Sequence, residues 1–90
     1  MATDTGCDSP PQLTLVARAF CHLCDDLHGA LVALKATRRF ALRVVDVDSD
    51  PNLLQQYDTE VPVLLDGDGN ELCRHRIDHA AIAKYLSGFG

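Results

Sequence analysis

The sequence Cys-His-Leu-Cys at residues 21–24 joins two segments with different hydrophobic patterns. The preceding residues 13–18, Leu-Thr-Leu-Val-Ala-Arg, are almost continuously apolar, which is typical of a strand covered on both faces. Two cysteines at a strand-to-helix junction indicate redox or metal chemistry. After the first cysteine, apolar residues recur at a helical spacing, forming one stripe: Leu23, Leu27, Ala30, Leu31 and Leu34.

The composition of the 90-residue chain fits one globular domain, with 47% hydrophobic and 23% charged residues. Thirteen acidic residues against eight basic ones give a formal charge of −5, the wrong sign for binding phosphates through Lys and Arg. The basic residues that cluster, at 38–39 and 74–76, are more typical of solvated faces than of ligand sites. We therefore expect no nucleic-acid partner.

The first twelve residues are small, acidic or proline-rich and can bury little surface. We therefore predict a flexible N-terminal tail over residues 1–12 and one domain over residues 13–90. The tail lacks the pattern of a secretory signal, and no later stretch approaches the ~20 apolar residues of a membrane span. From this we expect a cytoplasmic protein without membrane contact.

The four cysteines, at positions 7, 21, 24 and 73, are too few and too unevenly spaced for a secreted disulfide scaffold. In a reducing compartment, a close pair is more often catalytic or metal-binding than structural. Cys7 lies in the predicted tail, where a free thiol is most often incidental. Cys73 lies on a predicted strand, where cysteine usually acts as a small buried apolar residue.

The remainder of the chain contains further strand and helix signals. Asp50 before Pro51 predicts a helix start, because the carboxylate can cap free N–H groups and proline fits the first helical position. The predicted elements are a strand over residues 40–47, a short helix from Pro51 through Tyr57, strands over 61–65 and 71–77, and a helix capped by Asp78.

These elements follow one another in the order β-α-β-α-β-β-α. A helix between the first two strands predicts that they are parallel, and the short turn over residues 66–70 predicts that the last two are antiparallel. We therefore predict an α/β fold in which helices flank a four-stranded mixed sheet.

Three features together resemble the thioredoxin fold: Cys-x-x-Cys after the first strand, this element order, and Val61-Pro62 before the third strand. Within this fold the chain is most similar to the small bacterial glutaredoxin-like family with a Cys-His-Leu-Cys site. The likeness runs from residue 13 to about residue 86. It is carried by residues 21–25, 47–51, 57, 61–64 and 68–72.

The resemblance implies a cis Pro62 beside the cysteines, with Val61 offering backbone groups to an incoming peptide or to glutathione. It also implies a thiol–disulfide oxidoreductase active in electron transport and cell redox homeostasis. The expected substrate is a disulfide-containing protein or a small thiol. The substrate-binding residues would be Val61, Pro62 and His22.

The position of the pair suggests how the two cysteines divide the reaction. Cys21 at the first turn of a helix faces free N–H donors, which favour a thiolate, so we expect it to be the nucleophile and Cys24 to be the resolving cysteine. Asp25 and Asp26 oppose this effect with nearby negative charge. His22 could stabilise the thiolate when protonated or simply cover the rim of the site.

The stretch after the fourth strand differs from glutaredoxins that bind glutathione. Those proteins have a Gly-Gly pair there, followed by an Asp, and a proline inside the Cys-x-x-Cys. Here residues 74–78 are Arg-His-Arg-Ile-Asp, so we expect Asp78 to be a helix N-cap. We predict no cofactor, a monomer, and either thioredoxin reductase or glutathione as the reductant.

Two other classes of function remain open at this level. In the first, the chain is a non-catalytic thioredoxin-fold adaptor or an electron-transfer module. In the second, the cysteines bind zinc or an iron–sulfur cluster, for example through Cys21, Cys24, Cys73 and His75. A single Cys-x-x-Cys lacks the second pair that such sites commonly have, so we predict no metal site.

Overall fold

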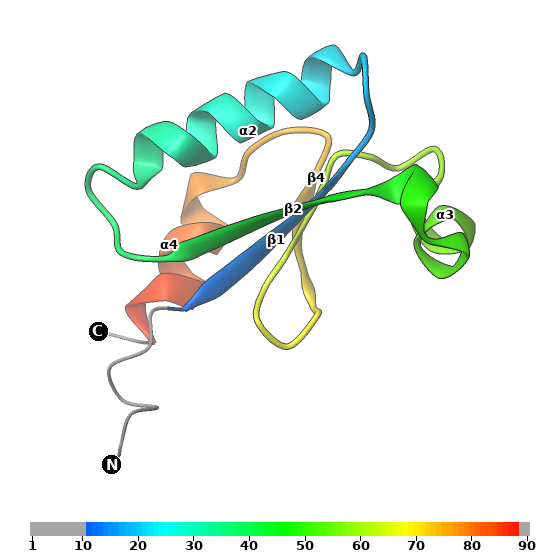
Figure 1. Cartoon of the computed structure of the whole chain (residues 1–90). Helices are drawn as coiled ribbons and strands as arrows, with labels where there is room; N and C mark the ends of the chain where they lie inside the picture. Colours follow the sequence, from blue (N-terminus) through cyan, green and yellow to red (C-terminus); the bar gives the residue numbers. More distant parts are fainter. Residues whose placement is uncertain (1–10, 89–90) are drawn as a thin grey trace.

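The structure is a computed structural model that describes residues 11–88 of the chain. Its elements follow the predicted order, with one additional 3-10 turn after the second strand (Figure 1). They are β1 (Gln12–Ala17), α2 (His22–Leu34), β2 (Ala41–Asp46), η1 (Val47–Ser49), α3 (Pro51–Tyr57), β3 (Val63–Leu65), β4 (Glu71–Arg74) and α4 (His79–Ser87).

The four strands form one mixed sheet in the order β2-β1-β3-β4. Strand β1 pairs in parallel with β2, and β3 is antiparallel to both β1 and β4. The predicted parallel pair, the predicted hairpin and the central position of the first strand are therefore confirmed.

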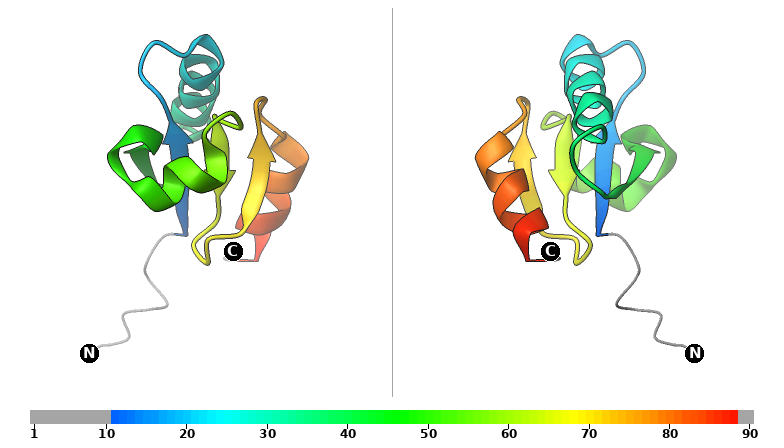
Figure 2. Two further views of the ribbon diagram at one scale, coloured as in Figure 1. Left: turned by 90° about the vertical axis from the view of Figure 1, so that its right-hand side faces the viewer. Right: turned by 90° about the vertical axis from the view of Figure 1, so that its left-hand side faces the viewer.

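Helices cover both faces of the sheet, with α2 and α4 on one face and α3 on the other (Figure 2). Side chains of β1 pack against the helices on both faces of the sheet, because successive strand residues point to opposite faces. Leu13 and Leu15 belong to the main core, and Val16 belongs to a smaller cluster with Val47 and Val63. The main core consists of Leu13, Leu15, Leu27, Leu31, Phe40, Leu64, Ile82 and Leu86.

The sheet register brings four chain segments to one end of the molecule. Ala17 at the end of β1 pairs with Asp46 at the end of β2, while Val16 pairs with Val63 at the start of β3. Val63 also pairs with Arg74 at the end of β4. The Cys-x-x-Cys after β1 and the residues just before β3 therefore lie at the same end of the sheet, although they are far apart in sequence (Figure 1).

Several predicted boundaries shift in the structure. Residues 1–10 lie outside the described part of the chain, but Gln12, which the sequence placed in the tail, belongs to β1. Strand β2 ends at Asp46 rather than at residue 47, because the Asp46 side chain accepts the Asp48 N–H at 2.9 Å and begins η1. The third strand begins at Val63, after the proline, rather than at residue 61.

The fourth strand is also shorter than predicted, ending at Arg74 instead of at residue 77. The cause is His75, whose φ of 68° takes the chain out of the extended conformation. Its N–H donates to the Pro62 carbonyl at 2.7 Å. Arg74 and Arg76, which both fall within the predicted strand over residues 71–77, therefore do not lie on one face of one strand.

Candidate redox site

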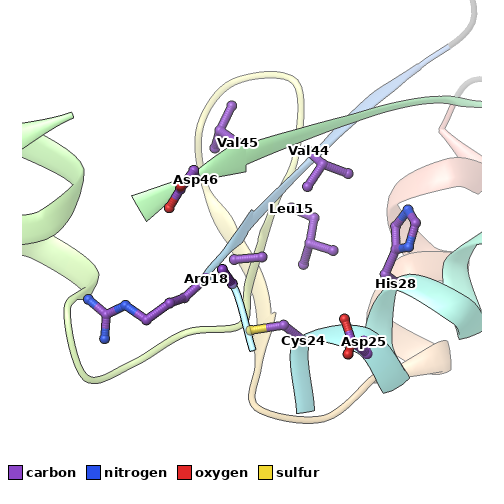
Figure 3. Close-up of a pocket in the computed structure, with 10 residues that line it drawn as sticks. Leu15, Arg18, Cys24, Asp25, His28, Val44, Val45 and Asp46 are labelled. Carbon is purple, nitrogen blue, oxygen red and sulfur yellow. The ribbon is translucent and has the colours of Figure 1, made fainter. Parts of the chain in front are cut away.

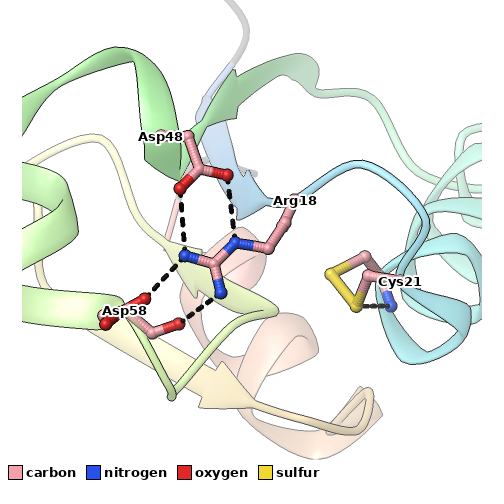
Figure 4. The surroundings of a disulfide bond; sticks show 5 residues. Arg18, Cys21, Asp48 and Asp58 are labelled. Atoms are coloured by element: carbon pink, nitrogen blue, oxygen red, sulfur yellow. Dashed lines mark hydrogen bonds and ion pairs between the residues drawn. A yellow bond between two sulfur atoms is a disulfide. The ribbon is translucent and has the colours of Figure 1, made fainter.

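Cys21 and Cys24 are joined by a disulfide at the N-terminus of α2, with their Cα atoms 5.2 Å apart (Figure 4). Cys21 has extended backbone angles and is the N-cap of the helix, and its Sγ accepts the Cys24 N–H at 3.1 Å. A sulfur in this position faces N–H groups that have no partner within the helix. The local geometry thus favours a negatively charged sulfur on Cys21 once the disulfide is opened.

The two sulfurs differ in their access to solvent. Cys24 lies about one helical turn after Cys21 and is only 3% exposed, whereas Cys21 is partly exposed at the surface. An incoming disulfide can therefore reach Cys21, but not Cys24. The roles of nucleophile and resolving cysteine stay predictions.

Two exposed apolar residues lie within two positions of Cys21 in the sequence. Phe20 has a φ of 59° and is fully exposed. Leu23 is 47% exposed, although the helical stripe predicted it to be in the core with Leu27 and Leu31, which are buried. It differs because it occupies the first turn of α2, which extends beyond the end of the sheet (Figure 1).

The predicted substrate-binding residues lie at the same end of the sheet as the disulfide. The Val61–Pro62 peptide bond is cis, as the resemblance implies. Pro62 is buried and its carbonyl is engaged by His75, while Val61 is half-buried. The Val61 side chain packs against the smaller core cluster, which leaves its backbone for a ligand, and His22 is exposed at the first position of α2.

An ion-pair network that sequence reasoning missed stabilises the segment leading to Cys21. Arg18 donates two hydrogen bonds of 3.0 Å to the Asp48 carboxylate, and it also contacts Asp58 at the end of α3 (Figure 4). Its hydrogen bonds to Asp48 and Asp58 raise the pKa of Arg18. The position of Arg18 between the first strand and the cysteines could have suggested an ion pair, but its partners are 30 and 40 residues away in the chain.

A second ion-pair network lies beside the cis proline. Arg74 binds the carboxylates of Glu60, which precedes Val61-Pro62, and of Glu71. The hydrogen bond from Arg74 is the main cause that lowers the pKa of both glutamates, and Thr59 adds to the effect on Glu60. Arg74 therefore links the end of β4 to the segment that begins β3.

This network predicts a loss of stability in acid. Because the pKa of each glutamate is lower in the folded state, its contribution is present above the unfolded pKa of about 4.3 and is lost as the pH falls through the folded value. Urea unfolding from about pH 6 to pH 3 should show this loss in the wild type and a smaller one in Arg74→Gln. Arg76→Gln is the control with the same change of charge, and an equal effect there would contradict the assignment.

The other candidate residues that the structure describes have structural roles or do not form a metal site. Asp78 is the N-cap of α4, as predicted, and accepts the Ala81 N–H at 3.1 Å. Cys73 packs against the main core, and burial raises the pKa of its thiol. Within residues 11–88, no group of three or more His, Cys, Asp and Glu side chains is arranged to hold a metal ion. Cys7 lies outside the described residues.

The fold and the paired cysteines define a thioredoxin-fold protein with a Cys-x-x-Cys disulfide. The chain matches the family described as Glutaredoxin-like domain (DUF836) over residues 12–87. This match covers most of the chain, so the protein belongs to that family. No curated protein matches it.

Solved structures with the same fold match the chain. Protein Ne2328 from Nitrosomonas europaea is 33% identical, with a TM-score of 0.79 over 87% of this chain and 93% of that one. Target protein XcR50 from X. campestris is 36% identical, with a TM-score of 0.66 over 84% of this chain and 96% of that one. A mutant thioredoxin from Halobacterium salinarum, 23% identical, shares the fold with a TM-score of 0.59 over 96% of this chain and 80% of that one.

No helix within residues 11–88 is both long enough and apolar enough to span a membrane.

Proposed function

We propose that this protein is a thiol–disulfide oxidoreductase that uses Cys21 as nucleophile and Cys24 as resolving cysteine. The observation that carries the proposal is the unequal placement of the two bonded sulfurs. Cys21 caps α2 and reaches the surface, while Cys24 is 3% exposed behind it. A purely structural disulfide gains nothing from having its more exposed sulfur at a helix N-terminus, whereas a nucleophile gains a stabilised thiolate.

The reaction starts from the reduced dithiol form. The Cys21 thiolate attacks one sulfur of a substrate disulfide, forming a mixed disulfide and releasing the first substrate thiolate. The Cys24 thiolate then attacks the Cys21 sulfur, forming the Cys21–Cys24 bond and releasing the second substrate thiolate. Two electrons pass from the protein to the substrate, and an external dithiol or thiol must return them.

The surface beside Cys21 favours a polypeptide as the substrate. Phe20 and Leu23 are exposed near it in the sequence, and a groove that begins at Leu23 is lined by apolar residues together with polar ones: Leu23, Leu27, Ile77, Asp26, His75 and Arg76. Apolar side chains around an exposed sulfur can bury apolar residues of a partner protein. We assign the residues at the start of β3 a binding role as well, in which the backbone of Val61 pairs with the bound segment and His22 covers the rim.

The segment after β4 favours a protein reductant over glutathione. It carries Arg-His-Arg at residues 74–76 where a glutathione site would need glycines, and Asp78 is engaged in capping α4. We therefore assign reduction of the disulfide to an enzyme of the thioredoxin reductase class. A cytoplasmic location, where thiols are kept reduced, completes the proposal.

A redox titration tests this function. Equilibration of the protein in buffers of graded potential, followed by alkylation of free thiols, should show Cys21 and Cys24 closing and opening together in one two-electron transition. The expected midpoint lies between about −270 and −120 mV, the range of thioredoxin-fold oxidoreductases. A pair that stays oxidised well below this range would be a structural disulfide and would contradict the proposal.

A further inference from the structure

A cavity of about 320 Å³ lies between the first turns of α2 and the ends of β1 and β2, on the side where Cys24 is buried (Figure 3). A volume of this size holds several water molecules, each of which occupies about 30 Å³ in the liquid. The residues that line it are Leu15, Ala17, Arg18, Ala19, Cys24, Asp25, His28, Val44, Val45 and Asp46. The resolving cysteine therefore borders a space that can hold water, although it is only 3% exposed.

The proposed reaction requires Cys24 to lose a proton at the stage of the mixed disulfide. The thiolate is the attacking species, and burial disfavours a charged sulfur. Unlike Cys21, Cys24 does not occupy the N-cap of α2. A nearby group that accepts its proton would therefore accelerate the resolving step.

Four titratable or charged side chains line the cavity around Cys24: Arg18, Asp25, His28 and Asp46. Arg18 is a cation held by Asp48 and Asp58, so it cannot accept a proton. Asp46 uses its carboxylate to cap η1 by accepting the Asp48 N–H. This leaves Asp25 and His28, both exposed to solvent on α2.

The helix geometry favours His28 over Asp25. His28 follows Cys24 by four residues, so the two side chains lie on the same side of α2, with Cβ atoms about 5–6 Å apart. Figure 3 shows Cys24 and His28 along the cavity side of the helix. Because both side chains line the cavity, a chain of cavity waters can join them. An imidazole is also a stronger base than a carboxylate and can both accept and release a proton near neutral pH.

We propose that His28 accepts the proton of Cys24 through cavity water during resolution, an inference that rests on the proposed oxidoreductase function. The Cys24 thiol gives its proton to His28 as its sulfur attacks Cys21. The new bond joins Cys24 to Cys21, and the bond between Cys21 and the substrate sulfur breaks. The departing substrate thiolate takes up a proton from solvent. His28 releases the proton of Cys24 to solvent and returns to its neutral form.

Rapid mixing of the reduced protein with dithiobis(nitrobenzoate) separates the two steps. Attack by Cys21 releases one coloured nitrothiobenzoate, and resolution by Cys24 releases the second. The measurement uses a background of Cys7→Ala and Cys73→Ala, so that no other thiol contributes. His28→Gln should slow the second phase on the order of 100-fold, the low end for general base catalysis, and leave the first phase unchanged.

The pH dependence gives a second readout that a merely structural role would not produce. In the parent protein, the second phase should level off as the pH is raised from about 5 to about 8, whereas in His28→Gln it should keep rising over this range, because Cys24 must then lose its proton directly to solvent. His79→Gln, which removes an exposed histidine on α4, should leave both phases unchanged. Asp25→Asn tests the other candidate base and should leave the second phase nearly unchanged. Asp26→Asn is its control, because Asp26 lies outside the cavity lining.

An unchanged second phase in His28→Gln would overturn the inference. A slower second phase in Asp25→Asn alone would also overturn it, because the Asp25 carboxylate would then be the group that accepts the proton of Cys24. A normal first phase in either case would leave the proposed function intact. If the reduced protein released no nitrothiobenzoate in the first phase, Cys21 would not be a nucleophile, and both the inference and the proposed function would be overturned.

Discussion

Cys21→Ser is expected to reduce the rate of disulfide reduction by about 1000-fold or more, to the background of the uncatalysed exchange. The reason is that Cys21 is the sulfur of the pair that reaches the surface, while Cys24 is 3% exposed behind it. A serine hydroxyl remains protonated at this position and is a poor nucleophile, so the covalent step is lost. The measurement is steady-state reduction of a protein disulfide with a constant supply of reductant.

Cys73→Ala is the matched control for this substitution. Cys73 is the free cysteine among the described residues, it packs against the main core, and burial raises the pKa of its thiol. Its thiolate is therefore disfavoured at neutral pH, and activity should persist in the variant. Retention of more than about a tenth of the activity by Cys21→Ser would contradict the assignment of the nucleophile.

Cys24→Ala is expected to stop the reaction after a single half-cycle. Cys21 still attacks the substrate, but the sulfur that would displace it is gone, so about one equivalent of substrate thiol is released and turnover then ceases. Alanine is the preferred substitution because a buried serine hydroxyl would need a hydrogen-bond partner. The time course of thiol release should show this burst and no steady rate.

Addition of a small external thiol should partly restore turnover in Cys24→Ala, because that thiol can replace the resolving cysteine. The same addition should not restore Cys21→Ser, in which no mixed disulfide forms. A steady rate in Cys24→Ala without any added thiol would show that the second cysteine is not needed for resolution.

The sheet and the cysteine pair could be predicted because the sequence patterns that indicate them are local. The apolar run before the cysteines, the helical stripe after them and the Asp50-Pro51 helix start each lie within a few residues. The structure confirms β1 in the centre of the sheet, α3 beginning at Pro51 and Cys21 capping α2. The cis Pro62 came from the resemblance, because a cis bond occurs at only about 5% of X–Pro bonds.

The features that were missed depend on contacts between distant residues. The two carboxylates that hold Arg18 lie 30 and 40 positions away, so spacing within the sequence does not reveal them. The early end of β4 follows from the positive φ of His75, which no residue spacing in the sequence reveals. The exposure of Leu23 depends on where the sheet ends beneath α2, and the helical period carries no information about that position.

The cavity beside Cys24 illustrates the same limit at the site itself. Asp25 and His28 are recognisable as polar helix residues, but the cavity they line also requires β1 and β2 as walls. The sequence placed negative charge near the cysteines without indicating which side of α2 each side chain occupies. The structure separates them, with Asp25 on the cavity and Asp26 on the groove that begins at Leu23.

The most direct test of the account is the identity of the covalent intermediate. Reduced Cys24→Ala protein is incubated with a disulfide-bonded peptide, and the product is digested under non-reducing conditions and analysed by mass. In a protein that also carries Cys7→Ala, the account predicts one peptide thiol per chain, attached to Cys21. An unmodified Cys21, or a peptide attached to Cys73 instead, would contradict it.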